Sequence, residues 1–107
     1  MAIAHLHPTE VAARLAGDTP PTIIDVREPW EYGLAHIEPS MLIPLAELPE
    51  RIERLDPAGS YALLCHHGVR SAMAANWMLQ QGFQDLVNIA GGIDAWSMHV
   101  NPDILRY

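Results

Sequence analysis

The chain of 107 residues contains no lysine and only one cysteine, and each shortage argues against a class of protein. Six arginines oppose 13 acidic residues, so the net charge is −7 and the chain repels a phosphate backbone such as that of a nucleic acid. A single cysteine cannot form an internal disulfide, and a free thiol is typical of a reducing compartment. No apolar run approaches the ~20 residues that span a bilayer. The composition therefore argues against a nucleic-acid-binding, disulfide-stapled or membrane-spanning protein.

The amino-terminal segment also lacks the pattern of an export signal. Residues 1–4 carry no basic side chain, and no long apolar stretch follows them. We therefore expect a cytoplasmic protein. With 107 residues, of which 50% are hydrophobic, the chain can fill one core and leaves no room for a second, so we expect one domain over residues 1–107.

Charge is distributed unevenly along the chain. Residues 1–60 hold ten acids and four arginines, a balance of −6, whereas residues 61–107 hold three acids and two arginines, a balance of −1. The half that contains the cysteine is nearly neutral, so any attraction for an anionic ligand there must be local. The acids of the first half could attract a basic protein, but we interpret them as a solvated surface.

Short apolar runs alternate with helical patterns. Proline and glycine punctuation predicts a helix over residues 8–15 and another over residues 71–81, closed by Gly17 and Gly82. We expect further helical segments at 45–55, interrupted at Pro49, and at 93–98, and strands at 22–26, 42–44, 61–64 and 86–89. This order predicts an α/β fold with a parallel sheet of about five strands and helices on both faces.

The single cysteine lies where a predicted strand turns into a predicted helix. Cys65-His66-His67-Gly68-Val69-Arg70 follows the strand at 61–64, and Ser71 opens the helix. Backbone N–H groups of such a loop and of the first helical turn have no backbone partners, so they can converge on the sulfur and stabilise a thiolate. The pattern therefore predicts a nucleophile at neutral pH.

A free cysteine more often serves as a small apolar core residue. Two neighbours favour the functional interpretation instead. Gly68 allows the loop to curl tightly, and Arg70 places a permanent cation near the same pocket.

The stretch from Cys65 to Ser71 resembles the active-site loop of the rhodanese (sulfurtransferase) family in its single-domain bacterial form. Two further segments fit the same pattern: Ile24-Asp25-Val26-Arg27-Glu28-Pro29-Trp30-Glu31-Tyr32, and Gly82-Phe83 with Asn88-Ile89-Ala90-Gly91-Gly92 through Trp96. The blocks occur in family order and span about residues 3–98. The chain departs from the pattern at Ala35, where the family usually has glycine, and in the turn at 39–41.

This resemblance implies a sulfur-transfer mechanism. The Cys65 thiolate would attack thiosulfate or another small anionic sulfur donor and become a persulfide, which cyanide, a thiol or a sulfur-carrier protein would then discharge. Asp25 and Arg27 would brace the site, and no metal or organic cofactor would be needed. The residues implied to bind the substrate are His66, His67, Gly68, Val69, Arg70 and Ser71.

Three alternatives remain open at this level. A phosphatase or arsenate reductase also uses a loop cysteine and a downstream arginine, but its loop is one residue longer. A non-catalytic interaction module would not need the intact Cys65. A protein that relays persulfide sulfur between other proteins, with little thiosulfate turnover, would show the same sequence features, so the sequence does not distinguish the two roles.

Some polar residues have simpler interpretations. Six histidines raise the question of a metal site, but Cys65, His66 and His67 are consecutive and adjacent residues rarely converge on one metal ion. We expect His66 and His67 to line the pocket rim as donors, and His36 to make a structural hydrogen bond.

Two aromatic residues and one arginine also have structural interpretations. We expect Trp30 and Trp96 to be core or pocket-wall residues. Arg27 could brace the site or form an ion pair with Glu28 or Glu31, and the pair could itself be the brace.

Overall fold

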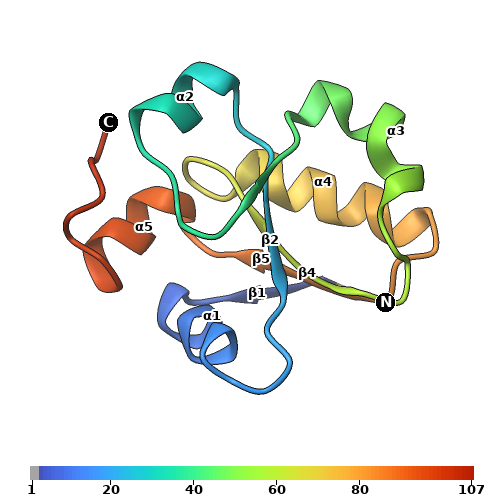
Figure 1. The fold of residues 1–107 in the computed structure, drawn as a ribbon, viewed down its shortest axis with the longest axis horizontal. Coiled ribbons are helices and arrows are strands. Elements are labelled where there is room, and N and C mark those ends of the chain that lie inside the picture. Colours follow the sequence, from blue (N-terminus) through green and yellow to red (C-terminus); the bar gives the residue numbers. More distant parts are fainter. Residues whose placement is uncertain (1–2) are drawn as a thin grey trace.

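The computed structural model describes residues 3–107, so Met1 and Ala2, part of the segment predicted to lack an export signal, lie outside the described residues. A five-stranded sheet forms the centre of the fold (Figure 1). The strands are β1 (Ala4–Leu6), β2 (Thr22–Asp25), β3 (Met41–Leu42), β4 (Ser60–Leu64) and β5 (Asp85–Ile89). The helices are α1 (Pro8–Leu15), α2 (Pro29–Leu34), α3 (Leu48–Arg51), α4 (Val69–Gln80) and α5 (Gly92–His99), with 3₁₀ turns η1 (Leu45–Glu47) and η2 (Ile52–Arg54).

All neighbouring strands run parallel, in the order β1-β5-β4-β2-β3. The predicted parallel α/β fold is therefore confirmed. Because parallel strands end at the same edge of a sheet, the segments that follow β2, β4 and β5 meet there. Asp25 ends β2 and Cys65 follows β4, so the sheet brings these two segments of the sequence together.

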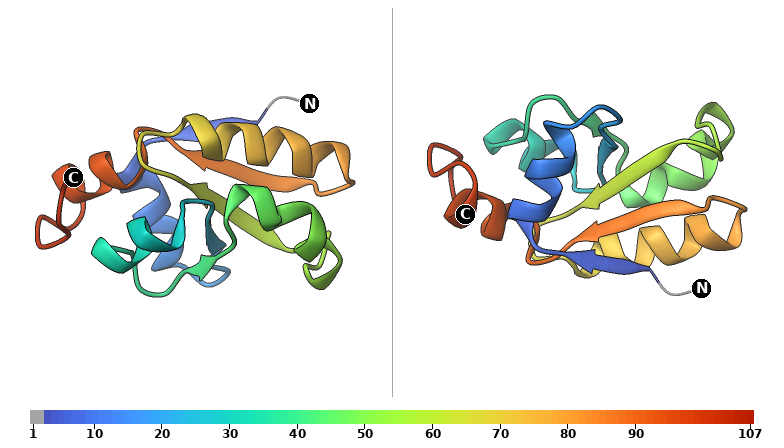
Figure 2. Two further views of the ribbon diagram at one scale, coloured as in Figure 1. Left: turned by 90° about the horizontal axis from the view of Figure 1, so that it is seen from above. Right: turned by 90° about the horizontal axis from the view of Figure 1, so that it is seen from below.

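Side chains of β4 alternate between two hydrophobic cores, as the pleat of a strand requires. Leu63 and Cys65 face the core that contains buried residues of α3 and α4, whereas Ala62 and Leu64 face the core that contains those of α1 and α5. Figure 2 shows these helices on opposite sides of the sheet. Cys65 thus lies on the α4 side, at the edge where the strands end.

The sequence patterns did not locate two elements. β1 has only three residues, of which Ala4 and His5 are exposed, so no apolar run marks it. α2 has six residues and too few buried positions for a helical period, although Glu28 and Glu31 form a capping box at its start. Both are short elements that depend on their neighbours.

Other boundaries differ from the predictions by one or two residues, with consequences at two positions. Pro49 does not interrupt a helix, because it lies in the first turn of α3, where no N–H donor is needed. Helix α4 begins at Val69, so Val69 and Arg70 belong to its first turn. Within residues 3–107, no helix combines the length and apolar character needed to cross a membrane.

Candidate active site

Cys65 is nearly inaccessible, and its sulfur receives hydrogen bonds from the loop and from α4. The backbone N–H of Gly68 lies 3.0 Å from Sγ, and the hydroxyl of Ser71 lies 3.2 Å from it. Only 1% of Cys65 is exposed. Both donors favour an anionic sulfur, and burial makes each hydrogen bond stronger than it would be in water. Among the described residues these two groups donate to the sulfur, where the sequence predicted a wider ring of loop N–H groups.

Asn88 on β5 orients the Ser71 hydroxyl and was not identified from the sequence. Its Oδ1 lies 2.6 Å from Ser71 Oγ, and its Nδ2 donates to the carbonyl oxygen of Gly68 at 3.1 Å. Ser71 has one hydroxyl proton, which can go to Asn88 or to the sulfur but not fully to both. A polar residue inside an otherwise apolar strand was the available signal.

The start of α5 fixes the backbone of the cysteine loop. The N–H of Ile93 donates to the carbonyl oxygen of Cys65 at 2.8 Å, and that of Asp94 donates to the carbonyl oxygen of His66 at 3.2 Å. In a trans peptide the C=O and the following N–H point in opposite directions. The N–H groups of His66 and His67 therefore point away from α5 and do not donate to this helix.

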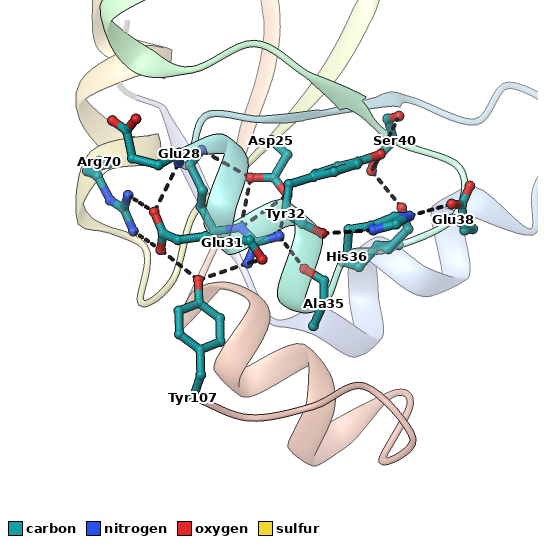
Figure 3. Close-up of polar contacts among 12 residues, drawn as sticks. Asp25, Glu28, Glu31, Tyr32, Ala35, His36, Glu38, Ser40, Arg70 and Tyr107 are labelled. Atoms are coloured by element: carbon teal, nitrogen blue, oxygen red, sulfur yellow. Dashed lines mark hydrogen bonds and ion pairs between the residues drawn. The ribbon is translucent and has the colours of Figure 1, made fainter.

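Arg70 is paired with Glu31, a residue 39 positions earlier in α2. The two guanidinium nitrogens donate to the two carboxylate oxygens at 2.6 and 2.9 Å. The sequence predicted that Arg70 places a permanent cation near the cysteine pocket and gave it no partner. In the structure a nearly buried carboxylate balances its charge, because the β2 and β4 segments adjoin at the sheet edge (Figure 3).

Arg27 pairs with Asp25, so the suggested ion pair with Glu28 or Glu31 is wrong. Both side chains of the Asp25–Arg27 pair are fully buried, with a shortest contact of 2.7 Å. Arg27 also donates to the carbonyl oxygens of Glu31, at 3.3 Å, and of Ala35, at 2.7 Å. A buried charge needs such a complete set of partners, and this one joins the end of β2 to α2.

The lowered pKa of the Glu31 carboxyl should make the stability of the fold depend on pH in the acid range. The hydrogen bonds from Arg70, opposed by burial and assisted by the hydroxyl of Tyr107, lower the pKa of Glu31 from 4.5 to about 2. A carboxyl with a lowered folded-state pKa stabilises the fold above its unfolded pKa, and that contribution is lost as the pH falls toward 2. We expect Glu31→Gln to lower the unfolding free energy by about 2 kcal/mol near neutral pH.

Urea unfolding at several pH values checks this expectation. The difference between the natural chain and Glu31→Gln should shrink as the pH falls from about 4.5 to about 2. Glu10→Gln, on the exposed side of α1, is the control and should show no such difference. A constant difference across the range would contradict the role given to Glu31.

His66 and His67 differ in their surroundings. The ring of His66 stacks between those of His67, at 3.9 Å, and Tyr107, at 4.0 Å. His67 has 63% of its side chain exposed, and its predicted role as a donor at the pocket rim stays a prediction. The ring nitrogen Nε2 of His66, however, is buried without a hydrogen-bond partner, so at that atom His66 is not the rim donor predicted. Val69, the remaining implied substrate residue, is 69% exposed.

Asp94 joins these histidines in a group of three potential metal ligands that the sequence did not suggest. One donor atom from each residue lies within 4.8 Å of the others. Two features argue against a metal ion here. The imidazole rings of His66 and His67 stack face to face, with 25° between their planes, instead of pointing their nitrogens at a common centre, and the Asp94 carboxylate already accepts from Arg106 at 2.9 Å.

Of the three residues predicted to have structural roles, two agree with the prediction and one differs in part. Trp96 is 4% exposed and belongs to the core, as predicted. His36 makes the predicted structural contact, with Nδ1 lying 3.0 Å from the carbonyl oxygen of Tyr32. Trp30 is not a core residue, because 64% of it is exposed. Its ring makes a T-shaped contact with that of Tyr107.

Comparison with known proteins identifies the family and the fold of this chain. Residues 7–99 match the family described as the rhodanese-like domain. The putative sulfurtransferase YtwF of Bacillus subtilis is 30% identical over 102 residues, which cover 95% of this chain and 98% of that protein. The crystal structure of a rhodanese-like domain protein from Staphylococcus aureus superimposes with a TM-score of 0.84 at 27% identity, covering 98% of this chain and 99% of that one.

Some relatives are much longer proteins. The putative sulfur carrier protein YrkF of Bacillus subtilis is 41% identical over 75 residues, which are 70% of this chain but only 40% of that protein. Across the relatives with 39–41% identity, the chain spans 22–40% of their length. Two findings do not depend on those longer proteins. The family match covers residues 7–99, and the similarity to YtwF extends along nearly the whole of both chains. The chain therefore belongs to the rhodanese-like domain family.

Proposed function

We propose that this protein is a sulfurtransferase that carries sulfane sulfur on Cys65 as a persulfide. One observation carries the proposal: the chain's single thiol lies at the carboxyl edge of a parallel sheet, where the Gly68 N–H donates to its sulfur and the Ser71 hydroxyl, shared with Asn88, lies 3.2 Å from it. Donors that stabilise a thiolate also stabilise the terminal sulfur of a persulfide. Relatives named as sulfurtransferases support the same reaction class.

The reaction has two half-steps. The Cys65 thiolate attacks the outer sulfur of thiosulfate, the S–S bond of thiosulfate breaks, and sulfite leaves with the bonding electron pair. A nucleophile such as cyanide or a thiol then attacks the terminal sulfur of the persulfide, and the Cys65 thiolate is the leaving group. No net oxidation occurs and no cofactor is required. Because sulfite leaves before the acceptor attacks the persulfide, the kinetics are ping-pong.

A protein could also be the donor or the acceptor. One relative is named as a putative sulfur carrier protein and another as a probable adenylyltransferase/sulfurtransferase, which suits transfer between proteins. The acidic first half of the chain would repel a nucleic acid but not a basic protein. Steady-state rates with thiosulfate and with glutathione persulfide, compared at equal cyanide, distinguish thiosulfate turnover from relay.

The intermediate can be tested by intact-protein mass spectrometry. Thiosulfate should add one sulfur atom to the protein, and cyanide should remove it. Because Cys65 is the only cysteine, the adduct has one possible site. A mass that does not change with thiosulfate or with a persulfide donor would contradict the proposal.

The phosphatase alternative can be tested with an aryl phosphate in the same samples. Only four residues separate Cys65 from Arg70, and a phosphate group needs a wider ring of N–H donors than a single sulfur atom does. In addition, Arg70 is engaged by Glu31. We expect negligible hydrolysis of p-nitrophenyl phosphate, and efficient hydrolysis that depends on Cys65 would favour a phosphatase.

A further inference from the structure

The segment after α5 returns to the active site and places Tyr107 there. The rhodanese-like match ends at residue 99, so this segment lies beyond the matched part of the chain. Three contacts hold it: Ser97 Oγ donates to the Ile104 carbonyl at 2.6 Å, Arg106 pairs with Asp94, and Ile104 packs against the core. Figure 3 shows the tyrosine hydroxyl directed toward Glu31, on the side of α2 that faces Arg70.

The Tyr107 hydroxyl connects two ion pairs. It donates to Glu31 Oε2 at 2.6 Å and accepts from Arg27 Nη1 at 2.8 Å. Burial, and then the hydrogen bond to Glu31, raise the pKa of Tyr107 to about 12, so the hydroxyl keeps its proton at neutral pH and remains a donor. The Asp25–Arg27 and Glu31–Arg70 pairs therefore form one network through this hydroxyl.

Glu31 has more donors than its pairing with Arg70 requires. Besides the two guanidinium contacts, its carboxylate accepts from Tyr107 and from the backbone N–H of Glu28 at 3.0 Å. If Arg70 turned toward an anion at Cys65, the carboxylate would still have two hydrogen bonds. Arg70 has room for this movement, because 34% of its side chain is exposed whereas only 5% of Glu31 is.

We propose that Tyr107 is a positioning residue. Its hydroxyl keeps a hydrogen bond to Glu31 when Arg70 leaves that carboxylate, so that Arg70 can turn to an anionic donor at Cys65. The inference rests on the function proposed above for the identity of that donor. Without the hydroxyl, Glu31 would lose one hydrogen-bond donor. If Arg70 then left, the nearly buried carboxylate would keep only the hydrogen bond from the Glu28 N–H among the donors in the described part of the chain. Such a carboxylate is costly, so Arg70 would stay on Glu31.

Two alkylating reagents that differ only in charge measure the availability of Arg70. Iodoacetate is an anion and iodoacetamide is neutral, and both modify Cys65, the only thiol. Tyr107→Phe removes the hydroxyl but keeps a ring that can stack on His66 at the same place. We expect it to lower the ratio of iodoacetate to iodoacetamide rates by roughly three- to tenfold, toward the ratio for Arg70→Ala.

Two further variants provide the controls. Tyr61→Phe removes a hydroxyl that donates to the Asp56 carbonyl at 2.9 Å, away from these ion pairs, and should leave the ratio unchanged. Glu31→Gln weakens the hold on Arg70 and should raise the ratio. Adding Tyr107→Phe to Glu31→Gln should then have no further effect, because the carboxylate through which Tyr107 acts is gone.

The outcomes separate this inference from the proposed function. An unchanged ratio in Tyr107→Phe, an equal slowing of both reagents, or a ratio that Arg70→Ala does not alter would overturn the inference. Alkylation requires no sulfur transfer, so these results stand even if thiosulfate and persulfide donors leave no adduct. With an active enzyme, Tyr107→Phe should raise KM for thiosulfate with little change in kcat, and should leave KM for a neutral trisulfide donor unchanged.

Discussion

Replacing Cys65 by serine is expected to abolish the sulfur adduct and to lower sulfur transfer from thiosulfate to cyanide by at least about 10⁴-fold. A serine hydroxyl does not ionise at neutral pH, and its oxygen is a poor nucleophile toward sulfur. The two donors at this position, the Gly68 N–H and the Ser71 hydroxyl, would hydrogen-bond to the new oxygen without activating it. The fold should survive, because serine is smaller than cysteine and the site already supplies polar partners.

Thiocyanate formation and intact mass, measured on both proteins, check this expectation. Ser71→Ala is the matched control, because it removes one donor to the sulfur and leaves the nucleophile in place. It should still form the adduct, with transfer slowed by roughly tenfold. An adduct that persists in Cys65→Ser would show that the sulfur is carried elsewhere and would refute the assignment.

The position of Cys65 between a strand and a helix could be predicted because its signals are local. A strand, a cysteine, Gly68 and a helix follow one another directly within residues 60–80, and the alternation of such units predicts a parallel sheet. The start of α1 was also predictable, because Pro8 occupies the first helical turn. Such features depend on residues that are close in sequence and not on tertiary packing.

The partners of the site could not be predicted, because they depend on which strands are neighbours. Asn88 meets Ser71 only because β5 lies beside β4, and Glu31 meets Arg70 only because β2 lies on the other side of β4. Tyr107 reaches Arg27 across 80 positions of sequence. Periodicity and spacing within one segment carry no information about these contacts.

The pairing of Arg27 was mispredicted for a different, local reason. Arg27 has Glu28 and Glu31 nearby in sequence, but a buried arginine pairs where the backbone directs it, and Asp25 lies two residues back at the end of β2. Trp30 was predicted to be a core or pocket-wall residue, yet it lies exposed in the first turn of a short helix, in which Glu31 is the buried residue. Polar partners at this edge thus determine which side chains are buried.

Replacing Gly92 by alanine is expected to disrupt the cysteine loop more than any other single change of a glycine to alanine near it. A Cβ built on Gly92 would clash with the carbonyl oxygens of His66 and Cys65, which are backbone atoms with little freedom to move. These are the same carbonyl groups that accept from Ile93 and Asp94. The backbone at Gly92 also has φ +63, which alanine adopts at a cost of about 1–2 kcal/mol.

We expect Gly92→Ala to lower the unfolding free energy by about 3 kcal/mol or more and sulfur transfer by at least about 100-fold. Gly82→Ala is the matched control, because Gly82 has φ +99 but no atom within 4 Å of the position of a Cβ. It should lose about 1–2 kcal/mol of stability and keep its activity.

Urea unfolding and the alkylation rate of Cys65 separate the two effects of the Gly92 substitution. Backbone strain is common to Gly92→Ala and Gly82→Ala, so only the clash with the loop carbonyls can distinguish them. If the α5 start holds the loop for catalysis, Gly92→Ala alone should change the reactivity of Cys65 under conditions where both variants are fully folded. Equal reactivity in the two folded variants would mean that the contacts of Ile93 and Asp94 stabilise the fold without orienting the sulfur site.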